Sequence, residues 1–274
     1  MNRTDRVALT FERLSAEGRA GLVTFITAGD PDLETSQQLM ERLPGAGADL
    51  IELGMPFSDP MADGPAIQAA NLRALANGIS LHKTLDMVAR FRQGNERTPV
   101  ILMGYFNPIY QYGPAGFVRD AVESGVDGLI MVDLPPEEDD ELCDAARTAG
   151  LHWVRLVTPT SDEKRLKQVL RNTSGFIYYV SIAGITGTRS AAAGAVGDAV
   201  GALRQHTSLP IAVGFGINSA DQVRQTGEIA DGAVVGSAII REIERNLDSL
   251  GVAKPQLLKR VSELVSALAE GLRS

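Results

Sequence analysis

The stretch GVDGLIMV, residues 125–132, decides the fold of this chain. Gly125 follows a segment with helical spacing of apolar residues, and a glycine at this place suits a left-handed helix stop. The run that comes next, Gly128–Val132, is short and continuously apolar. Parallel strands that are buried on both faces have this composition. The stretch therefore predicts one helix-to-strand step of an α/β protein.

Other parts of the chain repeat this step. The phrases GADLI at 47–51 and ADGAVV at 230–235 weakly echo GVDGLI at 125–130 and also begin apolar runs. The expected strands are Leu22–Thr27, Leu50–Leu53, Val100–Met103, Gly128–Val132, Trp153–Val157, Phe176–Ser181, Ile211–Val213 and Ala233–Val235. Expected helices between them include Leu33–Leu43, Ile67–Ala76, Ala115–Glu123, Glu137–Ala149, Glu163–Leu170, Ala195–Gln205 and Ala220–Gln225, with stops at Gly45, Gly125 and Gly150.

Alternation of strands and helices predicts a parallel sheet with helices outside it, and eight such units are enough to close a barrel. We therefore predict one α/β domain over residues 1–274, a single (β/α)8 TIM barrel. A doubly wound open sheet is the alternative. The segment Asp5–Glu17 predicts an extra N-terminal helix that caps the barrel floor. The tail Pro255–Leu272 has an apolar stripe at helical spacing, which indicates an outer-ring helix or, alternatively, a partner-binding helix.

The composition narrows the classes of function. The chain has 274 residues and a formal net charge of −8, which argues against non-specific binding to nucleic acid or to an anionic membrane. A phosphorylated small substrate remains compatible, because backbone amides bind phosphate locally. The charged segment Met1–Gly18 is not expected to be a signal peptide, and no run reaches the roughly 20 apolar residues of a membrane span. Cys143 is the single cysteine, as suits a reducing, cytoplasmic location.

Catalytic groups of such barrels lie at the carboxyl ends of the strands. Glu52 sits between Ile51 and Leu53 near the end of the second expected strand, so it points to the opposite side from both neighbours. If that side is the barrel mouth, burial raises the pKa of the carboxyl and suits it to acid–base work. A structural glutamate paired with an arginine at the rim is the alternative.

The segment that follows Glu52 is stiff and polar. The stretch IELGMPFSDPMADGP, residues 51–65, holds three prolines and places Asp63 before a Gly-Pro helix start. The residues alone allow Asp63 to be a plain helix cap or turn residue. As a whole, however, this stretch closely resembles the signature of tryptophan synthase α subunits. The resemblance continues through FITAGDP (25–31), YFNP (105–108), VDLP (132–135), GITG (184–187), GFGI (214–217) and GSA (236–238).

The resemblance implies a lyase of tryptophan biosynthesis that cleaves indole-3-glycerol phosphate into indole and glyceraldehyde 3-phosphate. Glu52 is then expected to protonate indole C3 and to help remove the proton of the side-chain hydroxyl. Asp63 is expected to accept a hydrogen bond from the indole N–H as positive charge develops there. Further substrate contacts are expected from Phe25, Tyr105, Tyr178 and Thr186, of which Thr186 also orients Asp63. Ordinary barrel core is the alternative role for Phe25 and Tyr178.

A phosphate site is expected after the seventh and eighth strands, where barrels of this kind commonly bind phosphate. Glycines let amides approach the phosphate oxygens, and a serine adds a hydroxyl. The expected residues are Gly187, Gly214, Phe215, Gly216, Gly236 and Ser237. A Gly-x-Gly by itself is usually just a turn. The segment Gly184–Gly194 is expected to be a flexible lid, with an ordinary surface loop as the alternative.

Other reaction classes find less support in the residues. A Schiff-base aldolase needs a lysine inside the mouth, but all five lysines fall in helical or tail segments. A metal-dependent epimerase would use histidines at strand ends, whereas His82 and His206 lie in helical patterns and His152 begins a strand. No metal is therefore expected, although an oxygen-only Mg²⁺ site formed by Glu52, Asp63 and Asp133 stays conceivable. A barrel that kept only a regulatory or binding role is a further alternative. The presence of both Glu52 and Asp63 argues against it.

The resemblance also implies a partner. This family docks to a β subunit that carries pyridoxal phosphate and receives indole through a tunnel, in an α2β2 complex. No cofactor is expected on this chain. The loops Pro56–Asp63 and Gly184–Ser190 are expected to face the β subunit. Asp59 is a candidate for signalling between the subunits, with a simple turn cap as the alternative.

Overall fold

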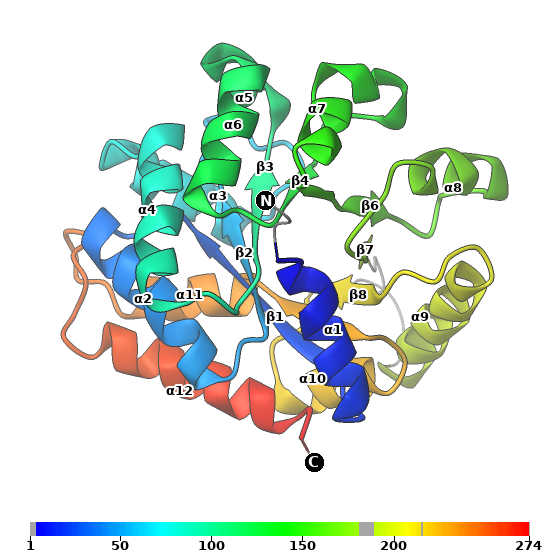
Figure 1. The fold of residues 1–274 in the computed structure, drawn as a ribbon. Coiled ribbons are helices and arrows are strands. Elements are labelled where there is room, and N and C mark those ends of the chain that lie inside the picture. Colours follow the sequence, from blue (N-terminus) through cyan, green and yellow to red (C-terminus); the bar gives the residue numbers. More distant parts are fainter. Residues whose placement is uncertain (1–3, 181–188, 215, 274) are drawn as a thin grey trace.

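Strands surrounded by helices make up the fold. The computed structural model describes residues 4–180, 189–214 and 216–273, and for residues 189–193 it describes the backbone alone. Within these ranges the strands are parallel and form one sheet in the order β5-β4-β3-β2-β1-β9-β8-β7-β6. Helices lie around the outside of the sheet (Figure 1). The predicted α/β barrel is confirmed.

The described strands are β1 (Gly21–Thr27), β2 (Leu50–Gly54), β3 (Val100–Gly104), β4 (Gly128–Met131), β5 (His152–Trp153), β6 (Arg155–Val157), β7 (Ile177–Val180), β8 (Ile211–Gly214) and β9 (Gly232–Val235). The described helices are α1 (Arg6–Ala16), α2 (Leu33–Ala46), α3 (Pro65–Ala76), α4 (Leu81–Gly94), α5 (Phe106–Tyr112), α6 (Pro114–Ser124), η1 (Pro136–Glu141), α7 (Cys143–Thr148), α8 (Glu163–Leu170), α9 (Arg189–Arg204), α10 (Ala220–Gly227), α11 (Ser237–Arg245) and α12 (Leu257–Glu270).

The sheet closes at the fifth unit, where the expected strand Trp153–Val157 is recorded as two short strands. β5 pairs with β4, and β6 pairs with β7. Between them the amide of Val154 donates to the carbonyl of Leu129 at 2.9 Å. One continuous segment therefore joins both edges of the sheet, and the described strands correspond to the units of a (β/α)8 barrel.

Helix α1 closes the amino-terminal end of the barrel, as the sequence predicts. Asp5 caps the helix by accepting from the amide of Ala8 at 2.9 Å. The apolar face of α1 packs into the barrel against inward side chains of the strands. This floor cluster consists of Val7, Phe11, Leu14, Val23, Leu50, Ile101, Ile130, Val154, Phe176, Ala212 and Val234. Because the floor is filled and closed, access to the interior remains at the carboxyl ends of the strands.

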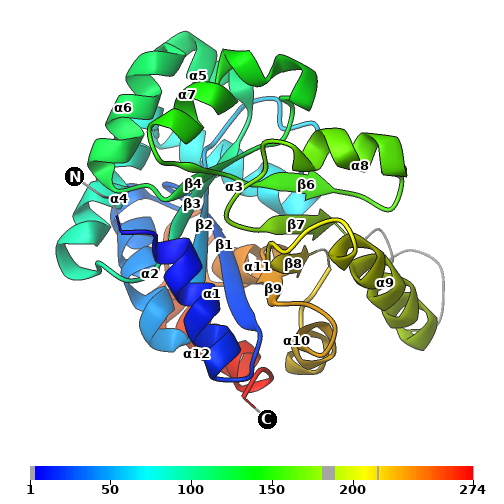
Figure 2. The same cartoon turned by 45° about the vertical axis from the view of Figure 1, so that its right-hand side comes forward.

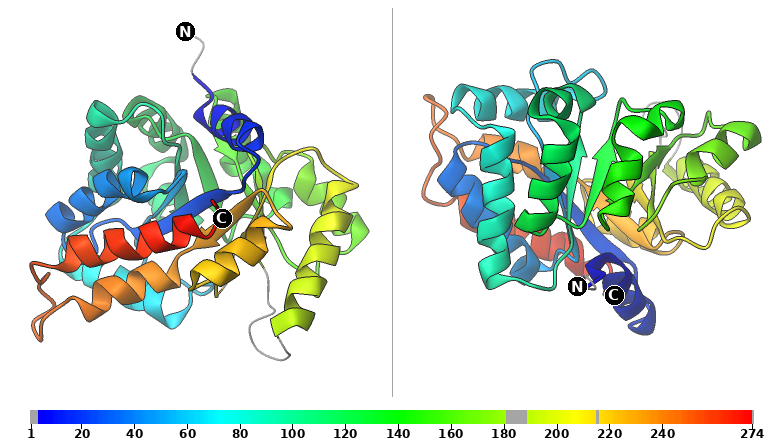
Figure 3. Two further views of the ribbon diagram at one scale, coloured as in Figure 1. Left: turned by 90° about the horizontal axis from the view of Figure 1, so that it is seen from below. Right: turned by 45° about the horizontal axis from the view of Figure 1, so that its top comes forward.

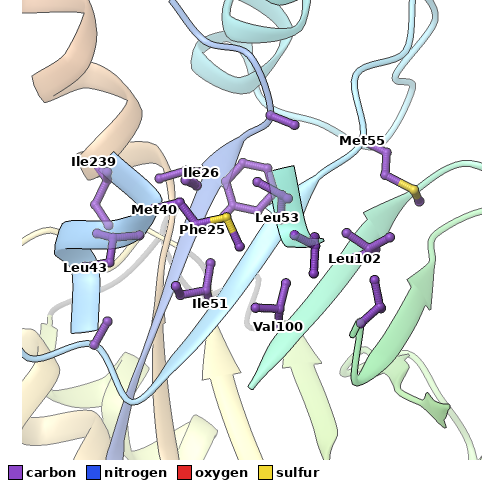
Figure 4. Packing of buried hydrophobic residues seen from close by; sticks show 14 of the residues in the cluster. Phe25, Ile26, Met40, Leu43, Ile51, Leu53, Met55, Val100, Leu102 and Ile239 are labelled. Carbon is purple, nitrogen blue, oxygen red and sulfur yellow. The ribbon is translucent and has the colours of Figure 1, made fainter. Parts of the chain in front are cut away.

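The outward side chains of the strands pack against the helices. Figure 4 shows Ile26 of β1 together with Met40 of α2 and Ile239 of α11, all buried. Helices α4–α7 cover one side of the barrel and α10–α12 the opposite side (Figures 2 and 3). Helix α12 packs against α2, α10 and α11. Its stripe of Leu257, Val261, Val265 and Leu268 is buried, which confirms the outer-ring interpretation of the tail.

Three local expectations differ from the structure. Helix α2 continues through Gly45 to Ala46 and is capped by Gly47, whose φ of 112° is left-handed. The expected helix Glu137–Ala149 is interrupted at Leu142, which has φ −150° and ψ −40°. Helix α9 begins at Arg189, six residues before the expected start at Ala195. The end of the expected lid is thus helical, and its residues 184–188 lie outside the described residues.

The interrupted helix has a physical cause in a buried ion pair. Arg155 points outward from β6, and one of its guanidinium nitrogens bonds Asp139 while the other donates to the carbonyl of Leu134 at 2.6 Å. Asn172 donates to the other oxygen of Asp139 at 2.7 Å. These contacts fix Asp139 against the barrel, so the segment around it forms a separate short 3-10 helix.

Candidate active site

Strand β2 carries Glu52 into the barrel interior. Its neighbours Ile51 and Leu53 pack outward in the same cluster as side chains of α2 and α4, whereas Leu50 belongs to the floor cluster inside the barrel. Side chains of a strand alternate between its two faces. Glu52 therefore shares the inward face of Leu50, one layer closer to the mouth. Glu52 thus lies inside the barrel, the position on which the acid–base interpretation depends.

The surroundings of Glu52 are apolar. The residue is 1% exposed, and its Oε1 has no hydrogen-bond partner among the described residues. Phe25 is its register neighbour on β1. Burial raises the pKa of Glu52 to about 8. Burial, and secondarily the charge of Glu52, also raises the pKa of the Tyr178 hydroxyl well above its ordinary value. Glu52 is thus a carboxyl that keeps its proton at neutral pH.

An aromatic and aliphatic lining covers the same inner layer. Met103, Leu156 and Tyr178 pack on the floor cluster but remain partly exposed, as suits the side chains nearest to an opening. Two glycines make room for the rings: a Cβ on Gly54 would lie 2.6 Å from the Phe25 ring, and a Cβ on Gly214 would lie 2.4 Å from the Tyr178 hydroxyl. These positions explain why glycine stands at both strand ends.

Asp63 lies in the loop between β2 and α3. Its carboxylate accepts from the Asn71 amide of α3 at 3.3 Å. Burial raises the pKa of Asp63 to about 6, although hydrogen bonds from Asn71 and from the Tyr105 hydroxyl pull it down. The two carboxyls therefore have different environments: Glu52 is enclosed by apolar side chains, and Asp63 is held by polar ones. Such a contrast separates the roles of an acid and an anion.

Tyr105 anchors the loop that carries Asp63. It follows β3 and is 3% exposed. Its hydroxyl accepts from the amide of Ala62 at 3.1 Å, and its ring lies 5.4 Å from the ring of Phe57. The loop is therefore fastened to the end of the neighbouring strand, which brings Asp63 to the rim of the barrel.

Four of the expected phosphate residues, Gly214, Gly216, Gly236 and Ser237, lie at the ends of β8 and β9. Gly216 has a φ of 73°, a conformation that favours glycine, and a Cβ there would meet nothing within 4 Å. Gly236 precedes α11, which begins at Ser237. The first turn of a helix leaves its N–H groups without intrahelical partners and attracts anions. The other expected site residues Thr186, Gly187 and Phe215 lie outside the described residues.

Comparison with known proteins decides the family. A sequence model described as "Tryptophan synthase alpha chain" matches residues 11–270. The chain belongs to this family.

Solved structures agree with this assignment. A tryptophan synthase subunit alpha from Legionella pneumophila str. Paris is 40% identical, with 99% of each chain covered and a TM-score of 0.91. A tryptophan synthase alpha chain from Legionella pneumophila subsp. pneumophila is 39% identical over 99% of this chain and 98% of that one, with a TM-score of 0.89. A tryptophan synthase structure from M. tuberculosis is 32% identical over 99% and 100%, with a TM-score of 0.86.

Membership in the tryptophan synthase alpha chain family gives the function at a coarse level. The chain is a lyase with the role of the alpha subunit in tryptophan biosynthesis. Among the residues described, no group of three or more His, Cys, Asp or Glu side chains could hold a metal ion. Asp133, one member of the conceivable Mg²⁺ site, instead accepts from the amide of Phe106 at the start of α5, at 2.8 Å. No described helix is both long and apolar enough to cross a membrane.

Three residues of the site, Asn71, Met103 and Leu156, were not predicted from the sequence. Asn71, which bonds Asp63, follows it by eight positions, and no short motif links the two residues. Met103 and Leu156 line the inner layer beside Tyr178. A signal for these two existed, because each lies two positions after an inward-facing residue, Ile101 or Val154, and so shares its face.

Proposed function

We propose that Glu52 and Asp63 together cleave indole-3-glycerol phosphate by acid–base chemistry. Protonated Glu52 gives its proton to indole C3, which turns the ring into a cationic leaving group. The resulting carboxylate takes the proton of the hydroxyl on the adjacent side-chain carbon. The O–H electron pair forms the aldehyde of glyceraldehyde 3-phosphate, the bond to C3 breaks, and its electron pair returns to the ring as neutral indole.

The observation that carries this proposal is the contrast between the two carboxyls. Glu52 is enclosed by apolar side chains and has a pKa of about 8, so it holds the proton that C3 requires at neutral pH. Asp63 has a pKa of about 6 and is ionised there. An anion beside the indole N–H stabilises the positive charge that C3 protonation creates. Each carboxyl thus has the protonation state that its role needs.

The remaining site residues fit the two ends of the substrate. Phe25 and Tyr178 give an apolar lining for the indole ring, with Tyr105 at the edge of the Asp63 loop and Thr186 expected across from it. The phosphate is assigned to amides of the strand ends and the hydroxyl of Ser237. The full set for the phosphate is Gly187, Gly214, Phe215, Gly216, Gly236 and Ser237. A structure with a glycerol-phosphate analogue tests this assignment.

The two pKa values predict the pH dependence of the reaction. Activity requires ionised Asp63 and protonated Glu52, so kcat/KM for indole release should fall below pH about 6 and above pH about 8, by about tenfold per further unit. The measurement is indole release by the purified chain between pH 5 and 9.5. Asp63→Asn should remove the acid limb and keep the basic one. A profile that is flat from pH 5 to 9 would contradict the assignment of both groups.

No cofactor is needed for this chemistry on this chain, because the proton donor and the anion are both protein side chains. The proposal therefore expects turnover to persist after treatment with a chelator. Pyridoxal phosphate belongs, in this proposal, to the β subunit of an α2β2 complex. The free and buried thiol of Cys143 suits a reducing compartment, and we accordingly assign the protein to the cytoplasm.

The loop Pro56–Asp63 is proposed to face the β subunit. Met61 in this loop is 85% exposed and Leu72 on the helix that follows is 62% exposed, a degree of apolar exposure that suits docking to another protein. Asp59 of the same loop is exposed as well. The conformation of the loop that positions Asp63 would then also depend on its contact with the β subunit.

Asp59→Ala tests the role of the loop in communication. We expect it to reduce the activation of indole release by added β subunit about fivefold while the turnover of the isolated chain changes less than twofold, since a rim charge mainly affects association. Both rates are measured without β subunit and with β subunit near half saturation, where weaker association lowers the activation. Equal losses in the two assays would show that Asp59 acts on the loop itself.

A further inference from the structure

Helix α3 reaches back to the loop that precedes it. Its N-cap, Gly64, offers no side chain to the helix, and Pro65 begins the first turn. The Gln68 amide donates to the backbone carbonyl of Asp63 at 2.8 Å. One turn later, Asn71 donates to the Asp63 carboxylate at 3.3 Å. The same helix therefore holds both the backbone and the acid group of Asp63.

Helix α3 is itself fixed to the barrel. The Arg73 guanidinium makes a two-point ion pair with Asp30 in the turn after β1, with nitrogen–oxygen distances of 2.7 and 3.0 Å. Asp30 is 1% exposed. Two-point pairs of this kind fix orientation as well as distance. Because Arg73 lies two residues from Asn71, the amide that contacts Asp63 is carried by an anchored segment.

We propose that Asn71 is a positioning residue for the reaction, which holds the Asp63 carboxylate in its ionised form and in place for the indole N–H. Asn71 is 3% exposed, so its amide is committed to the protein interior and is largely hidden from water. The inference rests on the role proposed above for Asp63. It assigns to Asn71 a task beyond helix stability.

Burial and the polar groups around Asp63 determine how readily its carboxyl loses its proton. Tyr105 approaches from the end of β3 and donates to Asp63, while Asp133 after β4 acts on the Tyr105 hydroxyl. Glu52 lies within the barrel. Burial is the largest influence on the pKa of Asp63 and raises it to about 6. Each lost donor should therefore move Asp63 further toward the neutral form.

Asn71→Leu tests the inference at nearly constant side-chain size, and Asn71→Ala replaces it if leucine does not fold. Loss of one hydrogen bond to a charged group shifts a pKa by about one unit. The apparent pKa of the acid limb of kcat/KM should therefore rise by about one unit. Activity should then fall about fivefold at pH 6, and less than twofold at pH 7.5, where most of Asp63 is still ionised. Asn77→Leu is the matched control, because Asn77 ends the same helix and donates to the Pro31 carbonyl instead.

Two further measurements separate this inference from the proposed function. In carbon-13 titrations of labelled aspartates, with Asp63→Asn for assignment, the pKa of Asp63 should rise in Asn71→Leu and stay unchanged in Asn77→Leu. An unchanged Asp63 titration in Asn71→Leu overturns the inference. A shifted titration without a shifted pH–rate profile supports the contact but removes Asp63 from the reaction. In an Asp63→Asn background, Asn71→Leu should cause no further loss, and an additive loss would mean that Asn71 acts elsewhere.

Discussion

Glu52→Gln is expected to lower kcat for indole release about 1,000-fold, the effect typical of removing a positioned general acid. Glutamine matches the shape of the protonated carboxyl but cannot give a proton to C3 or accept one from the hydroxyl. Substrate binding should change little, because the apolar lining made by Phe25 and Tyr178 stays in place. The measurement is steady-state turnover of indole-3-glycerol phosphate by the purified chain.

A matched control distinguishes this role from a general effect of charge. Glu41→Gln makes the same chemical change on α2, at an exposed position away from the barrel interior. It should leave kcat within twofold, and circular dichroism should show that both variants are folded. Activity of Glu52→Gln within tenfold of the unmodified chain would refute the acid–base role.

Much of the fold follows from local pattern. The apolar runs identify the strands that the structure describes, because a strand buried on both faces is mostly apolar. The helix Asp5–Glu17 and its place at the floor also follow from the sequence, since its apolar face needs a cover that only an open barrel end provides. Gly125 and Gly150 take the left-handed conformation at helix ends that was expected of them.

Expectations failed where distant contacts override local preference. The helix expected at Glu137–Ala149 divides because Asp139 turns to Arg155, which belongs to a strand farther along the chain. Gly45 looks like a helix stop, yet the helix continues through Ala46 and is capped by Gly47. The two partners of the Arg155 pair lie 16 positions apart in different elements, so the break is a property of the folded barrel.

The candidate site likewise contains features that follow from local sequence pattern and features that depend on distant contacts. The inward direction of Glu52 follows from strand alternation, and its high pKa follows from the apolar neighbours that share its face. The roles proposed for Glu52 and Asp63 follow from the resemblance to the family signature. Asn71 had no sequence signal, because its contact with Asp63 depends on how α3 is anchored to the turn after β1.

Burial of Glu52 should also make the stability of the protein depend on pH. The pKa is about 8 in the folded protein against an ordinary value of 4.5. Between these values the folded protein keeps a proton that the unfolded chain has released, so the free energy of unfolding falls as pH rises through this window. The carboxyl is 1% exposed, so the full shift bears on stability.

Glu52→Gln removes this titration. Relative to the unmodified chain, the variant should gain about 4 kcal/mol of unfolding free energy between pH 5 and pH 9, with nearly equal stability at the lower pH. Urea unfolding of both proteins across this range gives the difference, in which the other titrating groups cancel. A difference that stays constant with pH would mean that Glu52 ionises as readily in the barrel as in water.

Asp49 supplies a control of opposite sign. Burial raises the pKa of its carboxyl, but hydrogen bonds from Arg19, Arg13 and the Leu22 amide outweigh that effect and hold the pKa below 3.8. Asp49→Asn should therefore destabilise the protein by a constant amount above pH 5, and the loss should shrink only as pH falls below about 4. The combined result expected is a gain in unfolding free energy that depends on pH in Glu52→Gln and a loss that is constant above pH 5 in Asp49→Asn. That result would show that the buried carboxyl of Glu52, which the proposed reaction needs, destabilises the folded protein once the pH rises above its ordinary pKa.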